Sequence, residues 1–292
     1  MSQPLISIIT PAFKAEKTIK RAVDSALRQS FSDWELLIVS DDQQNYEQIL
    51  KDLDIVDKRL RFLSTNHIGS GSSIARNKAL SAARGQYIAA LDADDELKPE
   101  KLSQLLPLAK KYGAAISDIE FRDNDTYALL EQYNQMPSQE FATVKEIIPA
   151  CLQTYTIYLY DRSKIPDLYY DPDLLRAQDL VYLMSFFNRL DCIGVIPEKL
   201  HIYYRRQGSA FNSADTHQQS HDYKLKIINK LDRGQSSIEN KAAQLVLRRY
   251  MEFSLDVDKL YDETVLHDPK ADWIGIFKAQ LQERFFLSRL IN

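Results

Sequence analysis

The sequence contains little cysteine and little net charge, and it lacks any long apolar run. Its two cysteines, Cys151 and Cys192, are too few and too far apart for a disulfide framework or a cysteine-ligated zinc site, so we expect buried thiols. The formal net charge is −4, with 37 basic and 41 acidic residues, which gives no reason to expect a nucleic-acid partner. No stretch approaches the roughly 18 apolar residues of a membrane-spanning helix, and the N-terminus does not read as a secretion signal. We therefore expect a cytoplasmic protein.

A glycine-rich phosphate loop with a paired lysine is also missing after the first apolar run, "LISIIT" at residues 5–10. Its absence counts against a nucleotidyltransferase-like or phosphoryl-transfer enzyme, in which such a loop cradles the phosphates. The hydrophobic content of 45% in 292 residues is nevertheless enough for one large or two small domains with a core.

Short apolar runs alternate with amphipathic stretches over the first 120 residues, which predicts a mainly parallel α/β sheet with helices on both faces. We expect strands at residues 5–10, 34–40, 59–65, 86–92 and 114–121. Residues 121–212 are less regular and rich in tyrosine, and residues 213–292 are expected to form a helical appendage.

Three details support the predicted helices. The first helix places Ile19, Ala22, Val23, Ala26 and Leu27 on one face, at the spacing of an amphipathic helix. Gly85 fits the C-cap of a helix at residues 72–84, and Pro99 fits the first turn of the next helix.

Four carboxylates, Asp92, Asp94, Asp95 and Glu96, directly follow the strand predicted at residues 86–92. Ligands of open α/β sheets bind at the carboxyl ends of the strands, and two aspartates two residues apart point the same way when the chain is extended. Carboxylates repel phosphate, so a phosphate ligand here requires a divalent cation, for which oxygen ligands favour Mg²⁺ or Mn²⁺. The alternative is a solvated loop in which Asp95 or Glu96 caps the following helix.

The ordered stretches "SIITPAFKAEKTIKRAVDSALRQSFSDWELLIVSDD" and "ARNKALSAARGQYIAALDADD" resemble the family 2 glycosyltransferases, which have the Rossmann-like GT-A fold. The resemblance implies an inverting, nucleotide-sugar-dependent transferase. Residues 1–120 would then form the half of the domain that binds the nucleotide sugar, and residues 121–212 the half that binds the acceptor.

The resemblance also implies roles for the ends of the first strands. Thr10, Pro11 and Ala12 match the opening loop that packs along the nucleotide, or they form a plain turn. Asp41 matches the aspartate that accepts the base N–H and selects uracil, or it caps a helix. Arg76 matches a basic residue near the diphosphate, or it lies on a solvated helix face.

Asp92 and Asp94 match the family's Asp-x-Asp motif. Asp92 would contact the ribose or the metal shell, and Asp94 would ligate the Mn²⁺ or Mg²⁺ that bridges the diphosphate oxygens. The stretch "HIYYRRQGSAFNS" at residues 201–213 resembles the segment that closes over the diphosphate, with Arg205 or Arg206 as the contact. We expect His201 to pack rather than to bind metal.

The inverting reaction also requires a base for the acceptor hydroxyl, by analogy with inverting glycosidases. The family places an acidic pair at the start of a helix, and here that pair is Gln178-Asp179. Asp179 is therefore the predicted base, with helix capping as its alternative role. Arg176 is a candidate to orient it.

These assignments predict a metal-dependent enzyme of polysaccharide biosynthesis that transfers a sugar, most simply from a uridine diphosphate sugar, to a saccharide, a lipid-linked or a protein-linked glycan. Two departures from the family pattern, Gln178 and the run Ser40-Asp41-Asp42-Gln43 in place of an acidic pair followed by Gly-Ser, keep a second reading open. In that reading the chain is a non-catalytic relic that binds nucleotide or glycan.

The C-terminal stretch "WIGIFKAQLQERFFLSRLI" carries a broad apolar stripe. Such a stripe packs on the body of the protein or on a second subunit of a homodimer. Because Lys278, Arg284 and Arg289 lie beside it, peripheral contact with the inner face of a membrane is the alternative.

Overall fold

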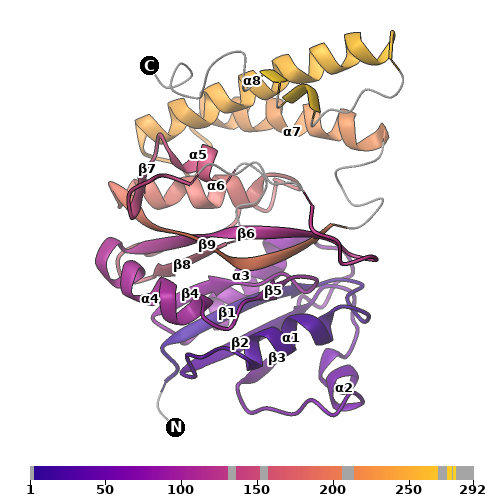
Figure 1. Cartoon of the computed structure of the whole chain (residues 1–292), viewed down its shortest axis with the longest axis vertical. Helices are drawn as coiled ribbons and strands as arrows, with labels where there is room; N and C mark the ends of the chain where they lie inside the picture. The colour runs from indigo at the N-terminus through magenta and orange to yellow at the C-terminus, as the bar shows by residue number, and fades with distance from the viewer. Residues whose placement is uncertain are drawn as a thin grey trace. The chain divides into compact units, whose positions relative to one another are not determined.

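The computed structural model divides the chain into two compact units, Met1–Arg206 and Gln207–Asn292 (Figure 1). It describes residues 3–130, 136–151, 157–205, 214–268, 275–277 and 279–280, with the backbone alone for residues 214–220.

Four parallel strands form the first half of the sheet in the first unit. They are β1 (Ile6–Ala12), β2 (Trp34–Ser40), β3 (Leu60–Ser64) and β4 (Tyr87–Ala90), in the spatial order β3-β2-β1-β4. The connecting helices are α1 (Ile19–Leu27), α2 (Tyr46–Lys51) and α3 (Ser72–Ala82). The four strands, α1 and α3 lie where the sequence predicts them.

The second half of the sheet is mixed. Strand β4 pairs antiparallel with β8 (Tyr158–Asp161), β8 pairs antiparallel with β6 (Ala114–Asp123), and β6 pairs parallel with β9 (Cys192–Arg205). The short strands β5 (Glu96–Leu97) and β7 (Phe141–Thr143) pair antiparallel with β9. The α/β class is therefore confirmed, with a sheet that is parallel in its first half and mixed as a whole.

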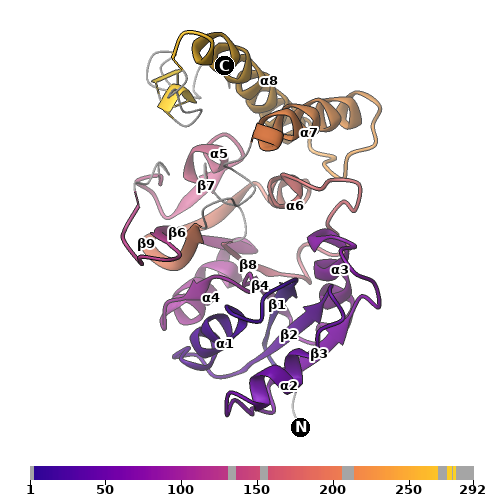
Figure 2. The same ribbon diagram turned by 90° about the vertical axis from the view of Figure 1, so that its right-hand side faces the viewer.

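Helices cover both faces of the parallel half, with α1 and α3 on opposite sides of β1 and β2 (Figure 2). The α1 face that the spacing predicts is buried at Ile19, Ala22, Val23 and Ala26, against a core that includes alternate residues of β1 and β2. The remaining helices of this unit are α4 (Lys101–Tyr112), α5 (Ile147–Ala150), α6 (Gln178–Ser185) and the 3₁₀ turn η1 (Phe186–Asn188).

Gly85 does not cap a helix. Helix α3 ends at Ala82 with Ala83 as its cap, and Gly85 lies in a close approach to β1, where an added Cβ would sit 2.6 Å from the Ser7 backbone nitrogen. Gly113 takes the left-handed conformation (φ +89°) that ends α4. Helix α4 begins at Lys101, so Pro99 precedes the helix instead of lying in its first turn.

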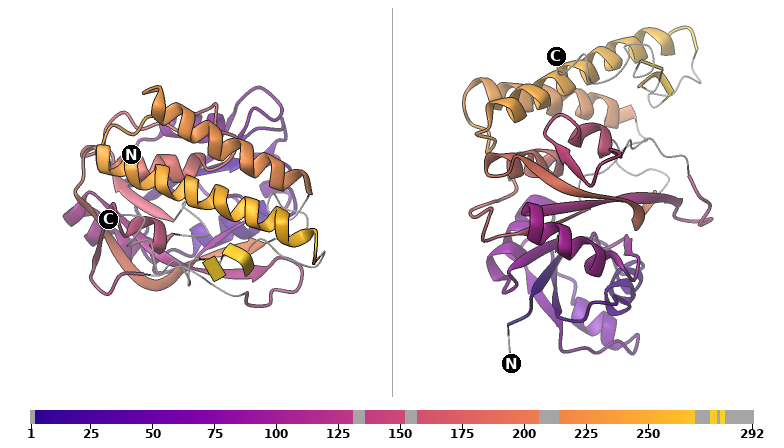
Figure 3. Two further views of the ribbon diagram at one scale, coloured as in Figure 1. Left: turned by 90° about the horizontal axis from the view of Figure 1, so that it is seen from above. Right: turned by 60° about the vertical axis from the view of Figure 1, so that its left-hand side comes forward.

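The second unit contains two long helices, α7 (Ala214–Asp232) and α8 (Lys241–Val265), which pack along each other (Figure 3). Between them, the buried Lys224 ammonium lies 2.7 Å from both carboxylate oxygens of Asp258. Most of the predicted apolar stripe lies outside the described residues, but the Phe277 ring packs 5.4 Å from the Phe253 ring of α8. Within the described part of the chain, every helix is too short or too polar to cross a bilayer.

Candidate active site at the carboxyl ends of the strands

The acidic motif forms a tight turn directly after β4. The Leu91 backbone N–H donates to the Ile9 carbonyl of β1 at 3.1 Å, which holds the start of the turn against the sheet. The Asp95 N–H then donates to the Asp92 carbonyl at 3.1 Å and closes the turn. As a result the side chains of Asp92 and Asp94 are half-buried at the carboxyl end of the parallel strands, whereas Asp95 is buried.

Arg76 of α3 lies beside this turn and is not on a solvated face. Its Nη2 donates to Asp92 Oδ1 at 2.6 Å, and the guanidinium carbon lies 5.2 Å from the centre of the Tyr170 ring. Burial opposes its charge, but the neighbouring Asp92 carboxylate holds the Arg76 pKa above its ordinary value.

Among the described residues, the Nε and Nη1 of Arg76 and the hydroxyl of Thr10 are buried polar atoms without a hydrogen-bond partner. Unpaired buried polar groups are unfavourable, so a site that leaves two guanidinium donors open is suited to an anionic ligand. Thr10 and Ala12 are buried at the end of β1, and Pro11 is half-buried between them.

Asp179 lies on the first turn of α6, near Arg76 and Asp92. Burial raises the pKa of its carboxyl, the Arg76 charge lowers it, and Asp92 raises it again. Asp179 is not the N-cap of α6, because Ala177 holds that position, and its Oδ1 accepts the adjacent Leu180 N–H at 2.9 Å. The structure thus brings together Asp92, Arg76 and Asp179 from three separate elements.

The residues around Asp179 fix the start of α6. Ala177 adopts a left-handed conformation (φ 53°), which is rare for a residue with a side chain. Gln178, which stands where the family has an acid, donates from Nε2 to the Ser72 hydroxyl of α3 at 3.0 Å. This hydrogen bond ties the start of α6 to the start of α3.

A cage of tyrosines, which the sequence did not reveal, packs under the site. The rings of Tyr170 and Tyr182 stack with their centroids 3.9 Å apart, and the Tyr160 and Tyr182 hydroxyls are 2.8 Å apart. The Tyr158 hydroxyl is hydrogen-bonded to that of Tyr170, and burial raises the pKa of both groups. Because Tyr170 also lies under Arg76, the cage fixes the distance between α3 and α6.

Asp41 is buried at the end of β2, where its carboxylate holds the loop before α3. Its Oδ1 accepts the Thr65 hydroxyl at 2.8 Å and also the Ser70 hydroxyl, and its Oδ2 accepts the Gly71 N–H at 2.8 Å. Reading a nucleobase would require exchanging some of these hydrogen bonds. The role of Asp41 as base reader stays a prediction.

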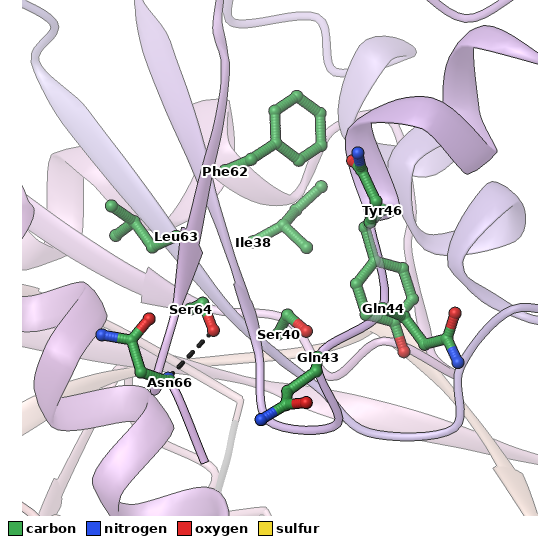
Figure 4. Close-up of a pocket in the computed structure, with 10 residues that line it drawn as sticks. Ile38, Ser40, Gln43, Gln44, Tyr46, Phe62, Leu63, Ser64 and Asn66 are labelled. Carbon is green, nitrogen blue, oxygen red and sulfur yellow. Dashed lines mark hydrogen bonds between the residues drawn. The ribbon is translucent and has the colours of Figure 1, made fainter. Parts of the chain in front are cut away.

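A hollow of about 500 Å³ lies between α2 and the ends of β2 and β3 (Figure 4). It combines the apolar side chains of Ile38 and Phe62 with side-chain amides and the Tyr46 ring. None of the predicted site residues lines it, so it is separate from the cluster around Asp92.

Arg205 and His201 both lie on β9. The Arg205 guanidinium is half-buried and its carbon lies 5.8 Å from the centre of the Phe121 ring, whereas Arg206 lies outside the described residues. His201 packs inside the protein, as predicted, with its ring between Lys101 and Asp95. The sequence did not single out Lys101, which reads as an ordinary surface lysine of α4.

Within the described residues, no group of three or more His, Cys, Asp or Glu side chains is arranged to hold a metal ion. A cation that binds together with a substrate phosphate, however, needs only one or two carboxylates from the protein. Asp92 and Asp94 meet that requirement, and the open donors of Arg76 beside them suit the phosphate. The residues present therefore fit a cation that arrives with a diphosphate.

Comparison with known proteins identifies the family of the chain. The family model described as "Glycosyl transferase family 2" matches residues 7–168, more than half of the chain. The chain belongs to glycosyl transferase family 2. The family 2 resemblance of the motifs is thereby confirmed.

Two curated relatives of this family 2 chain are similar over its first part. The putative teichuronic acid biosynthesis glycosyltransferase TuaG of Bacillus subtilis is 39% identical over 118 residues, which are 39% of this chain and 46% of that protein. WfgD of Escherichia coli, a UDP-Glc:alpha-D-GlcNAc-diphosphoundecaprenol beta-1,3-glucosyltransferase, is 39% identical over 38% of this chain and 43% of its own length. The matches thus span less than half the length of these relatives.

Solved structures confirm the GT-A fold of this family 2 chain. The crystal structure of S. aureus TarS in complex with UDP-GlcNAc matches with a TM-score of 0.63 at 18% identity, over 85% of this chain and 71% of that one. A mannosyltransferase from Pyrobaculum calidifontis, in complex with GDP-Man and Mn2+, matches with a TM-score of 0.56 at 12% identity, over 100% of this chain and 84% of that one. At these identities the likeness establishes the fold alone.

Proposed function

We propose that this chain is an inverting glycosyltransferase that moves a sugar from a uridine diphosphate sugar to a hydroxyl of a glycan acceptor in polysaccharide biosynthesis. The observation that carries the proposal is the cluster of Asp92, Arg76 and Asp179, which joins the turn after β4, α3 and α6. The names of TuaG and WfgD and the UDP-GlcNAc complex of TarS support this class of donor and acceptor.

In this proposal the donor diphosphate lies over the turn after β4. Asp92 and Asp94 are the residues that would hold a Mn²⁺ or Mg²⁺ ion, which when bound would supply Lewis-acid stabilisation of the departing charge. Arg76 donates its unpaired Nε and Nη1 to the diphosphate, and a guanidinium suits phosphate because it presents several donors in one plane. Arg205, at the end of β9, is a further candidate contact to the diphosphate.

Asp179 removes the proton from the acceptor hydroxyl. The acceptor oxygen forms a bond to the anomeric carbon while the bond from that carbon to the diphosphate oxygen breaks, so the proton goes to Asp179 and the leaving group is the nucleoside diphosphate. Burial raises the pKa of the Asp179 carboxyl, which makes it a better base than a solvated aspartate. The positive charge of Arg76 lowers the pKa of Asp179 and so stabilises its ionised carboxylate before the reaction.

The substitution Asp179→Asn tests the base directly. An amide keeps the shape of the side chain but cannot take a proton, so we expect turnover to fall about 100-fold or more, since general-base catalysis contributes about 10²- to 10⁴-fold. The affinity for UDP, measured by calorimetry, should stay within about twofold of the wild-type value, a difference of less than about 0.5 kcal/mol. Release of UDP from UDP-glucose and UDP-N-acetylglucosamine, offered with short glycans, measures the turnover.

Asp173→Asn is the matched control, since it removes an exposed carboxylate from the loop before α6 and should leave turnover unchanged. Equal turnover of the Asp179→Asn variant and the wild type would remove the base assignment. If the wild type binds UDP but turns over no donor with any glycan, the non-catalytic alternative, which Gln178 and Ser40 keep open, is favoured.

A further inference from the structure

Three ionisable side chains form a buried row behind the turn after β4. Lys101 Nζ of α4 lies 2.7 Å from His201 Nδ1 of β9, and His201 Nε2 lies 3.0 Å from Asp95 Oδ2. The relative exposures of the three residues are 0%, 0% and 1%. The row thus connects α4, β9 and the acidic turn entirely inside the protein.

Such a row needs a physical reason. Burying a lysine and a carboxylate is unfavourable, and well-packed apolar side chains of similar volume are often as stable or more stable. Buried polar groups nevertheless fix one arrangement of their neighbours, because any other arrangement leaves a group unpaired. The row therefore contributes more to the geometry of the acidic turn than to the net stability of the fold.

The imidazole of His201 bridges the other two groups through both of its ring nitrogens. Burial and the adjacent Lys101 lower the pKa of His201 well below its ordinary value, and burial lowers the pKa of Lys101 to about 7. Burial raises the pKa of Asp95, and the nearby Asp94 and Asp92 carboxylates raise it further. All three shifts favour the uncharged forms, so hydrogen bonds on both ring nitrogens, rather than an ion pair, hold Asp95 in place.

The second oxygen of Asp95 ties the turn to the end of β9. Asp95 Oδ1 accepts the Tyr204 N–H at 3.3 Å, and the Tyr204 hydroxyl donates to Glu96 Oε1 at 2.7 Å. Arg21 stacks on the Tyr204 ring, with its guanidinium carbon 3.6 Å from the ring centre, and donates to the Asp94 carbonyl. The turn is therefore held at the Asp94 carbonyl and at the Asp95 carboxylate. The second contact comes from Tyr204, the residue before Arg205.

We propose that His201 and Lys101 are positioning residues which, through Asp95, hold the Asp92-Ala93-Asp94 turn where both carboxylates can meet the cation of the bound nucleotide. The inference rests on the proposed function, because it requires a cation at Asp92 and Asp94. Partners that orient ligating carboxylates from outside typically change metal affinity about 10- to 100-fold when removed.

The test is a titration of Mn²⁺ into the full-length protein at saturating UDP, with free Mn²⁺ followed by electron paramagnetic resonance. We expect His201→Leu, which removes both ring nitrogens, to raise the Kd for Mn²⁺ about 10- to 100-fold. His201→Gln keeps an N–H near the position of Nε2, so its Kd should stay within about threefold of the wild-type value. Lys101→Met, which removes the hydrogen bond at Nδ1, should fall between the two.

Lys224→Met is the matched control, because Lys224 is also a buried lysine paired with a carboxylate, but it lies in the second unit. Its Kd for Mn²⁺ should equal that of the wild type even if its melting temperature changes. Circular dichroism reports whether each variant is folded. A purely structural role for the row would change the melting temperature of the His201 variants without changing the Kd.

The outcomes separate the two proposals. If the wild type with UDP binds no Mn²⁺, the metal part of the proposed function fails. If the wild type binds and folded His201→Leu binds within about twofold of it, or if Gln and Leu at this position are equally weak, the positioning role is overturned. Should His201→Leu not fold, Lys101→Met decides, because an unchanged Kd in that variant overturns the proposal.

Discussion

Single residues carry the chemistry of the proposed site, and Arg76 is the one on which most of it depends. Its Nη2 pairs with Asp92, its plane lies over Tyr170, and its charge acts on Asp179. Two donors of the same guanidinium stay open. The Arg76 side chain therefore pairs with the predicted metal ligand Asp92 and acts on the predicted base Asp179. Its two unpaired N–H donors remain for a ligand.

Arg76→Lys should weaken UDP binding about 10- to 100-fold. Lysine keeps the charge but not the planar set of donors, and one or two lost hydrogen bonds to a charged ligand are worth about 1.5–3 kcal/mol. Calorimetry with UDP in Mn²⁺ measures the loss. Arg59→Lys is the control, because Arg59 also pairs with an aspartate, Asp57, and stacks on an aromatic ring, Trp34, away from the site; equal losses in both variants would contradict the assignment.

The sequence was most informative at this scale where a residue follows a strongly periodic element. Asp92 and Asp94 could be placed at a sheet edge because the strand before them is a clear apolar run. Lys101 could not be recognised, because its partner His201 lies 100 positions away and the helix around it reads as amphipathic. The hydrogen bonds of Asp41 to the loop before α3 were equally invisible, since they depend on how that loop folds back.

Among the elements, α6 decides where the proposed base lies. Its first turn is held by the Gln178 hydrogen bond to Ser72 and by the tyrosine cage. Its N-cap, Ala177, adopts a left-handed conformation that costs a residue with a side chain roughly 1 kcal/mol or more. Strained backbone next to a proposed base suggests that the position of Asp179 is imposed by its surroundings.

Ala177→Gly should therefore leave the free energy of unfolding unchanged or raise it by up to about 1 kcal/mol, because glycine adopts this conformation without strain. Turnover should stay within about twofold, since the contacts around Asp179 remain. Urea denaturation provides the measurement. Ala242→Gly, at an exposed position in the first turn of α8 without a positive φ, should instead lower the free energy of unfolding, by up to about 1 kcal/mol, and a similar loss at position 177 would contradict the strain.

Elements of the first half of the sheet were predictable because each strand and helix there shows its own periodicity. In the mixed half β6 was predicted, at residues 114–121, but β8 and β9 were not, since they come from residues 158–205, where tyrosines and short runs hide the strands. Strand β8 inserts between β4 and β6, so two strands that seem consecutive in the sequence are separated in space. Gly85 was misassigned for a related reason. Glycine is needed at this position because the backbone of β1, distant in the sequence, approaches it closely, and not because a helix ends there.

At the scale of the whole molecule, two units follow each other along the chain, and all of the described site residues belong to the first. The second unit contributes the helix pair α7 and α8, with Lys224 and Asp258 buried between them. The predicted homodimer or membrane contact through the C-terminal stripe stays a prediction, as do the UDP-sugar donor and the glycan acceptor.

The central claim is that the first unit binds a uridine nucleotide through a cation at Asp92 and Asp94. Calorimetric titration of the full chain with UDP in Mn²⁺, repeated with a chelator and with GDP, tests it most directly. The account predicts that UDP binds in Mn²⁺, that the chelator weakens binding at least about tenfold, a change of about 1.4 kcal/mol, and that GDP binds more weakly. Equal binding of UDP with and without metal, or no binding of either nucleotide, would contradict it.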